Sequence, residues 1–231
     1  MKFQPIRTQS ATELLMDQLK TAILTGELRP GERLPSERDL EAQLRVSRAV
    51  INQALRRLQD LHFIRMIPRQ GNFVADYRVD GTLTTLDQIV RFRGANYQPN
   101  LLRSIYQVRR VTEGDTVQLA AERQDKAVLH QAQQALSRFQ NGEAPQEYAE
   151  HTFAFFRWLA LASGNQVYPL LVNSFRPTYL TLSQWNSEHG GAVKMLAYNR
   201  SLLAAVQAGD GQRAMALDAT LIDWSLANLL A

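Results

Sequence analysis

The side chains best suited to chemistry lie close to residue 50, in the segment RVSRAVINQALRRL. Arg48, Ala49 and Asn52 follow Ser47 there. An arginine side chain matches the acceptor atoms of guanine, and an asparagine side chain matches the edge of adenine, so both can read bases in a DNA major groove. The free backbone N–H groups at the start of a helix attract phosphate. These residues therefore offer recognition of nucleic acid.

Two short helices joined by a tight turn, within residues 34–58, are predicted to present these side chains. Ser36 can cap the first helix, with Asp39 three residues later closing a capping box. Ser47 is predicted to cap the second helix. Helical spacing places the inward face of that second helix on Val50, Ala54, Leu55 and Leu58. An ordinary helical hairpin would show the same pattern, so this segment alone does not decide the function.

A predicted β-hairpin follows at once, in the segment FIRMIPRQGNFVADY. Residues 63–67 and 72–75 read as two short strands, and residues 68–71 form the turn between them. Arg69, Gln70 and Gly71 stand at the tip. Two helices followed by such a hairpin form a winged helix, whose wing lies along a minor groove or the phosphate backbone.

These segments resemble the DNA-binding domain of GntR-type bacterial transcription regulators. The resemblance extends upstream through ILTGELRPGERLPSERDL, residues 23–40. It implies DNA contacts at Arg38, Ser47, Arg48, Ala49, Val50, Asn52 and Gly71, to which the hairpin adds Arg69 and Gln70. The family commonly has arginine at the position of Asn52. Because asparagine can pair with adenine whereas arginine prefers guanine, the operator is expected to differ from that of better-known relatives.

Composition sets the surrounding limits. The chain has 231 residues, enough for two domains, and no cysteine, which fits a reducing compartment. We find no signal peptide and no long uncharged apolar stretch, so we expect a cytoplasmic protein that spans no membrane. The whole net charge of +4 lies within the first 75 residues, where phosphate contacts need it. We expect a winged helix-turn-helix domain at 1–76, a linker with a short helix at 77–98, and a helical domain at 99–231.

The predicted fold class is mainly α. An N-terminal winged helix-turn-helix domain with a small β-hairpin wing precedes an antiparallel bundle of six to seven helices. Helices are expected at 11–24, 86–92, 100–123, 126–139, 145–162, 167–189, 193–208 and 210–230. The first is expected to bury Leu14, Leu15, Leu19, Ile23 and Leu24. The long helix at 100–123 is expected to have one face made of Leu101, Ile105, Val108, Thr112, Leu119 and Ala120.

The bundle is expected to hold no metal and no cofactor. Many GntR regulators with this kind of helical domain bind a metal, and the resemblance places their ligand positions at Thr152, Phe156, Asn199 and Leu221. None of these side chains has the imidazole or carboxylate group that such a metal needs. His151, four residues after Glu147, points away from that face and is interpreted as a surface histidine.

The segments at 105–115 and 152–182 resemble the fatty-acid-responsive, FadR-type branch of the family. That resemblance implies a long-chain acyl-CoA or another hydrophobic acid as effector, bound by Arg109, Tyr168, Tyr179, Thr220 and Trp224. The aromatic residues also suit an ordinary core. Arg109 also suits a solvated position or an ion pair with Glu113. The branch has glycine where this chain has Leu217, and a leucine there could block the CoA portion.

The sequence therefore predicts a ligand-responsive regulator. Its partners would be double-stranded operator DNA, a small-molecule effector, and a second copy of the chain, because relatives are homodimers. No nucleophile motif or phosphate-binding loop appears, so we expect no enzyme activity and no catalytic residue. Two alternatives stay open: a different small organic-acid effector, or a DNA-binding protein without an effector.

Overall fold

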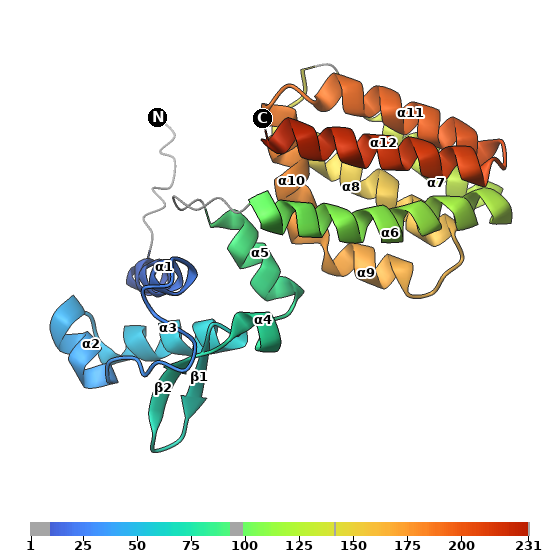
Figure 1. Cartoon of the computed structure of the whole chain (residues 1–231). Coiled ribbons are helices and arrows are strands. Elements are labelled where there is room, and N and C mark those ends of the chain that lie inside the picture. The colour runs from blue at the N-terminus through green and yellow to red at the C-terminus, as the bar shows by residue number, and fades with distance from the viewer. Residues whose placement is uncertain (1–9, 93–98, 141, 231) are drawn as a thin grey trace. The chain divides into compact units, whose positions relative to one another are not determined.

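The computed structural model describes residues 10–92, 99–140 and 142–230 (Figure 1). The chain divides into two compact units, residues 1–97 and 98–231. The predicted fold class is confirmed, since both units are mainly helical and the described residues form one two-stranded antiparallel sheet. No described helix combines the length and the apolar character that a membrane crossing requires.

The described part of the first unit contains five helices and the hairpin. The elements are α1 (Ala11–Leu24), α2 (Glu37–Leu44), α3 (Arg48–Asp60), β1 (Ile64–Ile67), β2 (Gly71–Val74), α4 (Tyr77–Asp80) and α5 (Leu83–Arg91). Their core is built around Ile51, Leu55 and Leu58 of α3, each fully buried. Because α3 contributes the centre of this core, its opposite face is fixed at the surface.

The helix caps follow the sequence in one case and depart from it in another. Ser36 caps α2 as predicted: its hydroxyl accepts a hydrogen bond from the backbone N–H of Asp39, and the Asp39 carboxylate accepts one from the backbone N–H of Ser36. Ser47 occupies the N-cap position of α3, but its hydroxyl makes no capping hydrogen bond. The prediction for Ser47 was therefore right in position and wrong in bonding, which leaves the hydroxyl exposed.

Three positions predicted for the core of the first unit, Leu14, Leu24 and Val50, are not fully buried. Val50 is half-buried and Ile51 is fully buried in its place, because Ile51, Leu55 and Leu58 share one stripe of α3 at helical spacing. In α1, Leu14 is 48% exposed, and Thr12 and Met16 complete the buried stripe instead.

The wing is supported by a third stretch of extended chain. In the hairpin, Ile64 pairs with Val74 and Ile67 pairs with Gly71. Residues 31–34 run along the other side of β2: the backbone N–H of Leu34 donates to the Asn72 carbonyl at 2.8 Å, and that of Val74 donates to the Glu32 carbonyl at 2.9 Å. The wing is therefore attached to the chain just before α2.

The region predicted as a linker is largely helical. The hydroxyl of Thr85 in α5 donates to the backbone carbonyl of Leu61 at 2.9 Å, and Lys20 of α1 donates to the side chain of Gln88 at 3.2 Å. The helix α5 therefore packs on the first unit. The predicted interruption at 94–99 lies, except for Pro99, outside the described residues.

The second unit contains seven described helices. They are α6 (Pro99–Arg123), α7 (Lys126–Ser137), α8 (Pro145–Ala162), α9 (Tyr168–Ser174), α10 (Arg176–Glu188), α11 (Ala192–Gln207) and α12 (Gly211–Leu230). In Figure 1, α6, α8, α11 and α12 lie along one another, and their contacts form the body of the bundle. The single helix predicted at 167–189 is wrong, because the chain breaks at Phe175, two residues before Pro177. Proline lacks an N–H and clashes with the preceding turn, so one straight helix cannot continue.

The buried face of α6 differs from the predicted one. Leu101 is half-buried and Val108 is 47% exposed. The buried stripe holds polar groups in their place, with Tyr106, Arg109 and Glu113 all below 9% exposure. Burying a charge requires a partner. We therefore consider this polar stripe of α6 a candidate functional site and not only a packing surface.

Candidate nucleic-acid interface and ligand pocket

The start of α3 presents the predicted reading residues to solvent. Arg48 and Ala49 are exposed in its first turn. The Arg48 Nε lies 3.1 Å from Glu37 Oε2, with 72% of the arginine side chain exposed. An ion pair this exposed contributes little to stability. Arg48 can therefore exchange Glu37 for an acceptor on DNA at small cost.

The other residues of α2 and α3 that are predicted to contact DNA differ in their solvent exposure. Arg38, in the first turn of α2, and Ser47, before α3, are exposed. Val50 and Asn52 are half-buried, so only part of each side chain is open to a partner. The helix therefore offers its N-terminal turn more fully than its second turn.

The wing tip has the backbone shape that a tight hairpin requires. Arg69 and Gln70 are exposed, and Arg69 adopts a left-handed conformation with φ of 62°. Gly71 has φ of 120°, a conformation that favours glycine. The backbone N–H of Gln70 donates to the Ile67 carbonyl at 3.1 Å and closes the turn. Arg69 thereby lies in the turn at the tip of the hairpin, exposed to solvent.

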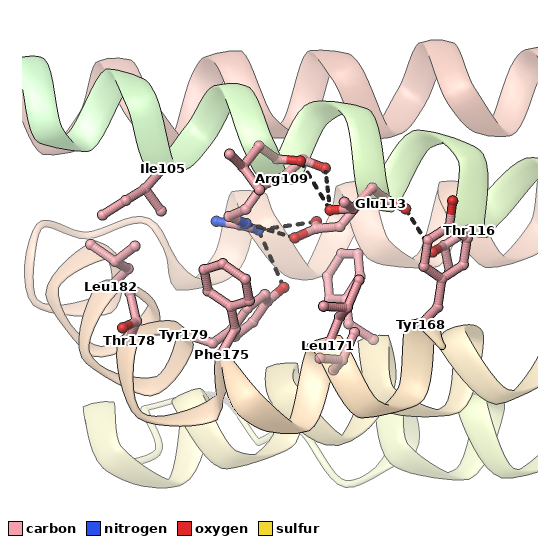
Figure 2. A pocket seen from close by; sticks show the side chains of 14 residues that line it. Ile105, Arg109, Glu113, Thr116, Tyr168, Leu171, Phe175, Thr178, Tyr179 and Leu182 are labelled. Carbon is pink, nitrogen blue, oxygen red and sulfur yellow. Dashed lines mark hydrogen bonds and ion pairs between the residues drawn. The ribbon is translucent and has the colours of Figure 1, made fainter. Parts of the chain in front are cut away.

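The second unit contains an apolar cavity of about 130 Å³ between α6 and the pair α9 and α10 (Figure 2). Three of the predicted effector residues, Arg109, Tyr168 and Tyr179, lie on its wall. The other lining residues are Ile105, Val108, Thr112, Glu113, Thr116, Phe156, Leu171, Val172, Phe175, Thr178 and Leu182. The cavity is therefore apolar along most of its length, with one charged pair in its wall.

Arg109 is held by Glu113 and two tyrosines. Its Nε and Nη2 lie 2.6 and 3.1 Å from the two carboxylate oxygens of Glu113, and Nη2 also donates to the Tyr179 hydroxyl at 3.3 Å. The guanidinium carbon lies 4.9 and 4.6 Å from the ring centres of Tyr106 and Tyr179. Burial acts to lower the pKa of Arg109, but Glu113 and the phenols raise it well above its ordinary value. Arg109 is therefore charged, and its charge is already balanced.

A second acid is buried on α12. Asp218 is 0% exposed, and neither of its carboxylate oxygens has a hydrogen-bond partner among the described residues. Burial, followed by the charge of Glu113, raises the pKa of Asp218 well above its usual range. Its neutral form is the one that burial without a partner tolerates.

Tyr168 lies where α9 begins. Its hydroxyl donates to the carboxylate of Asp115 on α6, and that hydrogen bond, followed by partial burial, raises the pKa of the phenol. Figure 2 shows Tyr168 and Arg109 at separate places along the cavity. The Tyr168–Asp115 contact thus joins α9 to α6 beside the cavity.

The structure does not bring Thr220 and Trp224 into this cavity. Thr220 is exposed and its hydroxyl donates to the Ala216 carbonyl at 2.8 Å. Trp224 is half-buried against Tyr198, with the Lys194 amine 4.8 Å from its ring centre. Both residues lie beside the buried stripe of α12 and not on it, so their predicted role in effector binding stays a prediction that this cavity does not support. Leu217 packs on the core and is also absent from the cavity wall.

The positions matched to metal ligands are all buried. Thr152, Phe156, Asn199 and Leu221 are each at most 3% exposed. Within the described ranges, no three His, Cys, Asp or Glu side chains gather in a way that could hold a metal ion. The nearest partner of His151 is Glu143, with Nδ1 and Oε2 2.9 Å apart, and its side chain is 27% exposed. This histidine, interpreted as a surface residue, is thus half-buried and paired.

Several lining residues were not singled out from the sequence. They come mostly from α9 and α10, and they are Leu171, Val172, Phe175, Thr178 and Leu182. Their spacing of three, four and seven residues marks a helical stripe. That signal was available, but it looks the same for a packed core as for a cavity wall.

Comparisons with known proteins agree with the geometry of both units. The protein-family model described as "Bacterial regulatory proteins, gntR family" matches residues 11–74, and the family model of the FCD domain matches residues 104–223. The HTH-type transcriptional regulator Mce2R of Mycobacterium tuberculosis is 32% identical over the whole chain and 96% of its own length. The "Fatty acid metabolism regulator protein" of Proteus mirabilis is 22% identical over 91% of this chain and 87% of its own.

One solved structure gives the same fold. It is described as a GntR-family transcriptional regulator from Pseudomonas syringae pv. tomato, and it matches with a TM-score of 0.51 and 17% identity. The match covers 95% of this chain and 84% of that one.

Proposed function

Because the chain belongs to the gntR family of bacterial regulatory proteins and contains an FCD domain, we propose that it is a transcription regulator in which a hydrophobic effector controls binding to operator DNA. The first unit binds the operator and the second binds the effector. The observation that carries this proposal is the combination of an exposed basic helix start and wing with an apolar cavity in a separate unit.

The DNA-binding part rests on α3 and the wing. We propose that Arg48 and Asn52 read base edges, that Ser47 and the first turn of α3 meet phosphate, and that Arg69 and Gln70 follow the backbone or the minor groove. Arg38, Ala49, Val50 and Gly71 complete the proposed surface. Arg48→Ala is expected to weaken operator binding by about 1–3 kcal/mol and to relax base preference. Glu37→Gln is the matched control, because it removes the ion pair and keeps the arginine.

For the effector, we propose the acyl chain of a long-chain acyl-CoA or a similar hydrophobic acid. The cavity wall is apolar, which suits an acyl chain. A relative of matching length is described as a fatty acid metabolism regulator. Arg109 and Tyr179 would meet the polar end of the ligand, and Tyr168 would lie beside its path. Thr220 and Trp224 lie apart from the cavity and are not included in this proposal.

The charges favour a thioester over a free carboxylate. Arg109 already gives two hydrogen bonds to Glu113, and Asp218 lies close enough for Glu113 to affect its pKa. A free carboxylate would therefore find no unbalanced positive charge among the lining residues, and burying it would be costly. A thioester is uncharged and can accept one hydrogen bond from Tyr179.

The size of the cavity sets a further condition. About 130 Å³ is similar to engineered cavities of about 150 Å³ that bind benzene, and pockets for drug-sized ligands are roughly 300–1,000 Å³. A long acyl chain thus requires that part of the wall move. The same volume favours a second candidate, a small uncharged or weakly acidic organic molecule that fits the cavity as it stands.

We propose that two copies of the chain bind one palindromic operator, in which each winged helix occupies one half-site. Effector binding would then change the relative orientation of the two DNA-binding units and so the operator affinity.

The test is a calorimetric titration of the full chain with acyl-CoAs of increasing chain length, each compared with its free fatty acid. The proposal predicts saturable binding near one ligand per chain, tighter for the thioester, and lost in Tyr179→Ala. Trp224→Ala, which alters a residue outside the cavity, should bind as the wild type does. Binding of small uncharged or weakly acidic organic molecules, without binding of any acyl-CoA, would favour the second candidate.

A further inference from the structure

Arg33 lies against the wing although it belongs to the segment before α2. Its backbone forms a bridge with Phe73 of β2, in the short stretch where residues 31–34 pair with that strand. Its side chain covers Gly71: a Cβ atom at that position would stand 3.0 Å from Arg33 Nε and 3.2 Å from Nη2. The absence of a side chain at Gly71 therefore makes room for the guanidinium.

The guanidinium of Arg33 has no acidic partner in the described part of the chain, where no carboxylate lies within 4.0 Å of it. The adjacent acid, Glu32, instead accepts a hydrogen bond from the backbone N–H of Arg29 at 3.0 Å. Arg33 is exposed, and the wing-tip residue Arg69 is two positions from Gly71. Arg33 thus lies along the side of the hairpin, and Arg69 lies at its tip.

We infer that Arg33 binds a phosphate of the DNA backbone beside the wing. A guanidinium can give two parallel hydrogen bonds to phosphate oxygens, and the contact with Gly71 fixes its position before DNA arrives. Such a contact positions the wing and carries no base preference of its own. This inference rests on the proposed DNA-binding function, and it adds a residue outside the helix, turn and wing tip that the sequence pointed to.

The test compares the wild type with Arg33→Gln and Arg33→Lys as full chains. Binding to two DNA duplexes, one selected by the wild type from a random pool and one scrambled, is measured by fluorescence anisotropy between 0.05 and 0.3 M salt. A plot of log affinity against log salt concentration has a negative slope, and each lost phosphate contact makes that slope shallower by about 0.9. At 0.1 M salt this corresponds to a roughly eightfold loss of affinity. Arg33→Gln should show this loss for each bound protomer on both duplexes, whereas Arg33→Lys should keep the slope.

Two controls separate this effect from general damage. Arg138→Gln removes an exposed arginine from the end of α7 and makes the same change in net charge, so it should leave the slope unchanged. Thermal unfolding shows whether each variant is folded. An unchanged slope in folded Arg33→Gln, or a loss confined to the selected duplex, would overturn the inference while DNA binding stands. A wild type that binds neither duplex would contradict the proposed function and this inference together.

Discussion

Asp218 is a fully buried carboxyl group for which the described residues provide no hydrogen-bond partner. Its folded-state pKa is raised by burial and by Glu113, so folding favours the protonated acid. The stability that this provides is fully present below the unfolded pKa of about 3.9 and is lost as pH rises toward the folded value. The wild type therefore bears a growing penalty above about pH 4.

Asp218→Asn should remove that penalty. We expect the difference in unfolding free energy between variant and wild type to shift in favour of the variant by up to about 1.4 kcal/mol for each pH unit between the two pKa values. Urea unfolding at pH 4.5, 5.5 and 6.5 measures it. Asp223→Asn, which alters an exposed acid of the same helix, is the control. A difference that stays constant with pH would show that Asp218 is not protonated by burial.

Arg109 and Glu113 form a pair in which each side chain is only 10% exposed. Replacing one partner leaves an unpaired buried charge, so Arg109→Met or Glu113→Leu alone should cost about 3–5 kcal/mol. The double variant should cost much less than the sum, because no charge is left behind. Denaturant unfolding of the four proteins measures this coupling, and additive losses would mean that the two groups act independently.

At the scale of single residues, the sequence predicted the exposure or bonding of some side chains and not of others. Arg48 and Ser36 followed from spacing and type, because exposure and capping are local properties. An ion pair between Arg109 and Glu113 was one of several interpretations that the sequence left open. Two oppositely charged residues four positions apart give the same sequence pattern on a buried and on a solvated helix face. The surroundings of Asp218 depend on the helices that pack against α12, and no local sequence pattern records them.

Among the elements, α9 is the least anchored wall of the cavity. It has seven residues and none is buried, and it contributes Tyr168, Leu171 and Val172 to the lining. A helix this short is marginal without packing. It is therefore the wall that we expect to move when the cavity enlarges.

Hydrogen exchange should show this motion. Amides of α9 are expected to exchange faster than those of α8 and α12, and a bound acyl-CoA should slow them by closing the cavity around its chain. Mass spectrometry of peptides covering 166–176, with and without ligand, measures both effects. Protection of α9 equal to that of α12 in the free protein would argue for a rigid wall and a small ligand.

Most element boundaries could be predicted because their signals are local. Capping residues, proline and glycine set the bounds of α1, α2, α8 and the hairpin within one or two residues of expectation. The helix break at Phe175 was not predicted, because the apolar stripe continues from α9 into α10. Pro177 was the local signal for that break. The α5 helix was expected to be part of a linker. Tertiary contacts attach it to the first unit: its hydrogen bonds with Leu61 and Lys20, and the packing of Ile89 on the core.

For the whole molecule, the two units carry separate tasks that the sequence distinguished by charge and pattern. The net positive charge lies with the winged helix, and the remaining chain is balanced. The family and the fold followed from that pattern and from matched segments. The position of the cavity did not follow from the matched segments, because Thr220 and Trp224 belong to α12, which contributes no residue to the cavity wall.

Operator affinity measured with and without effector tests the central claim most directly. Fluorescence anisotropy of the full chain on its selected operator would be recorded in a saturating long-chain acyl-CoA and in its absence, with Tyr179→Ala as the variant that cannot respond. We predict a change in affinity of about 5- to 150-fold, the usual range of coupling between sites, in the wild type only. An operator affinity that stays the same while calorimetry shows the ligand bound would contradict the account.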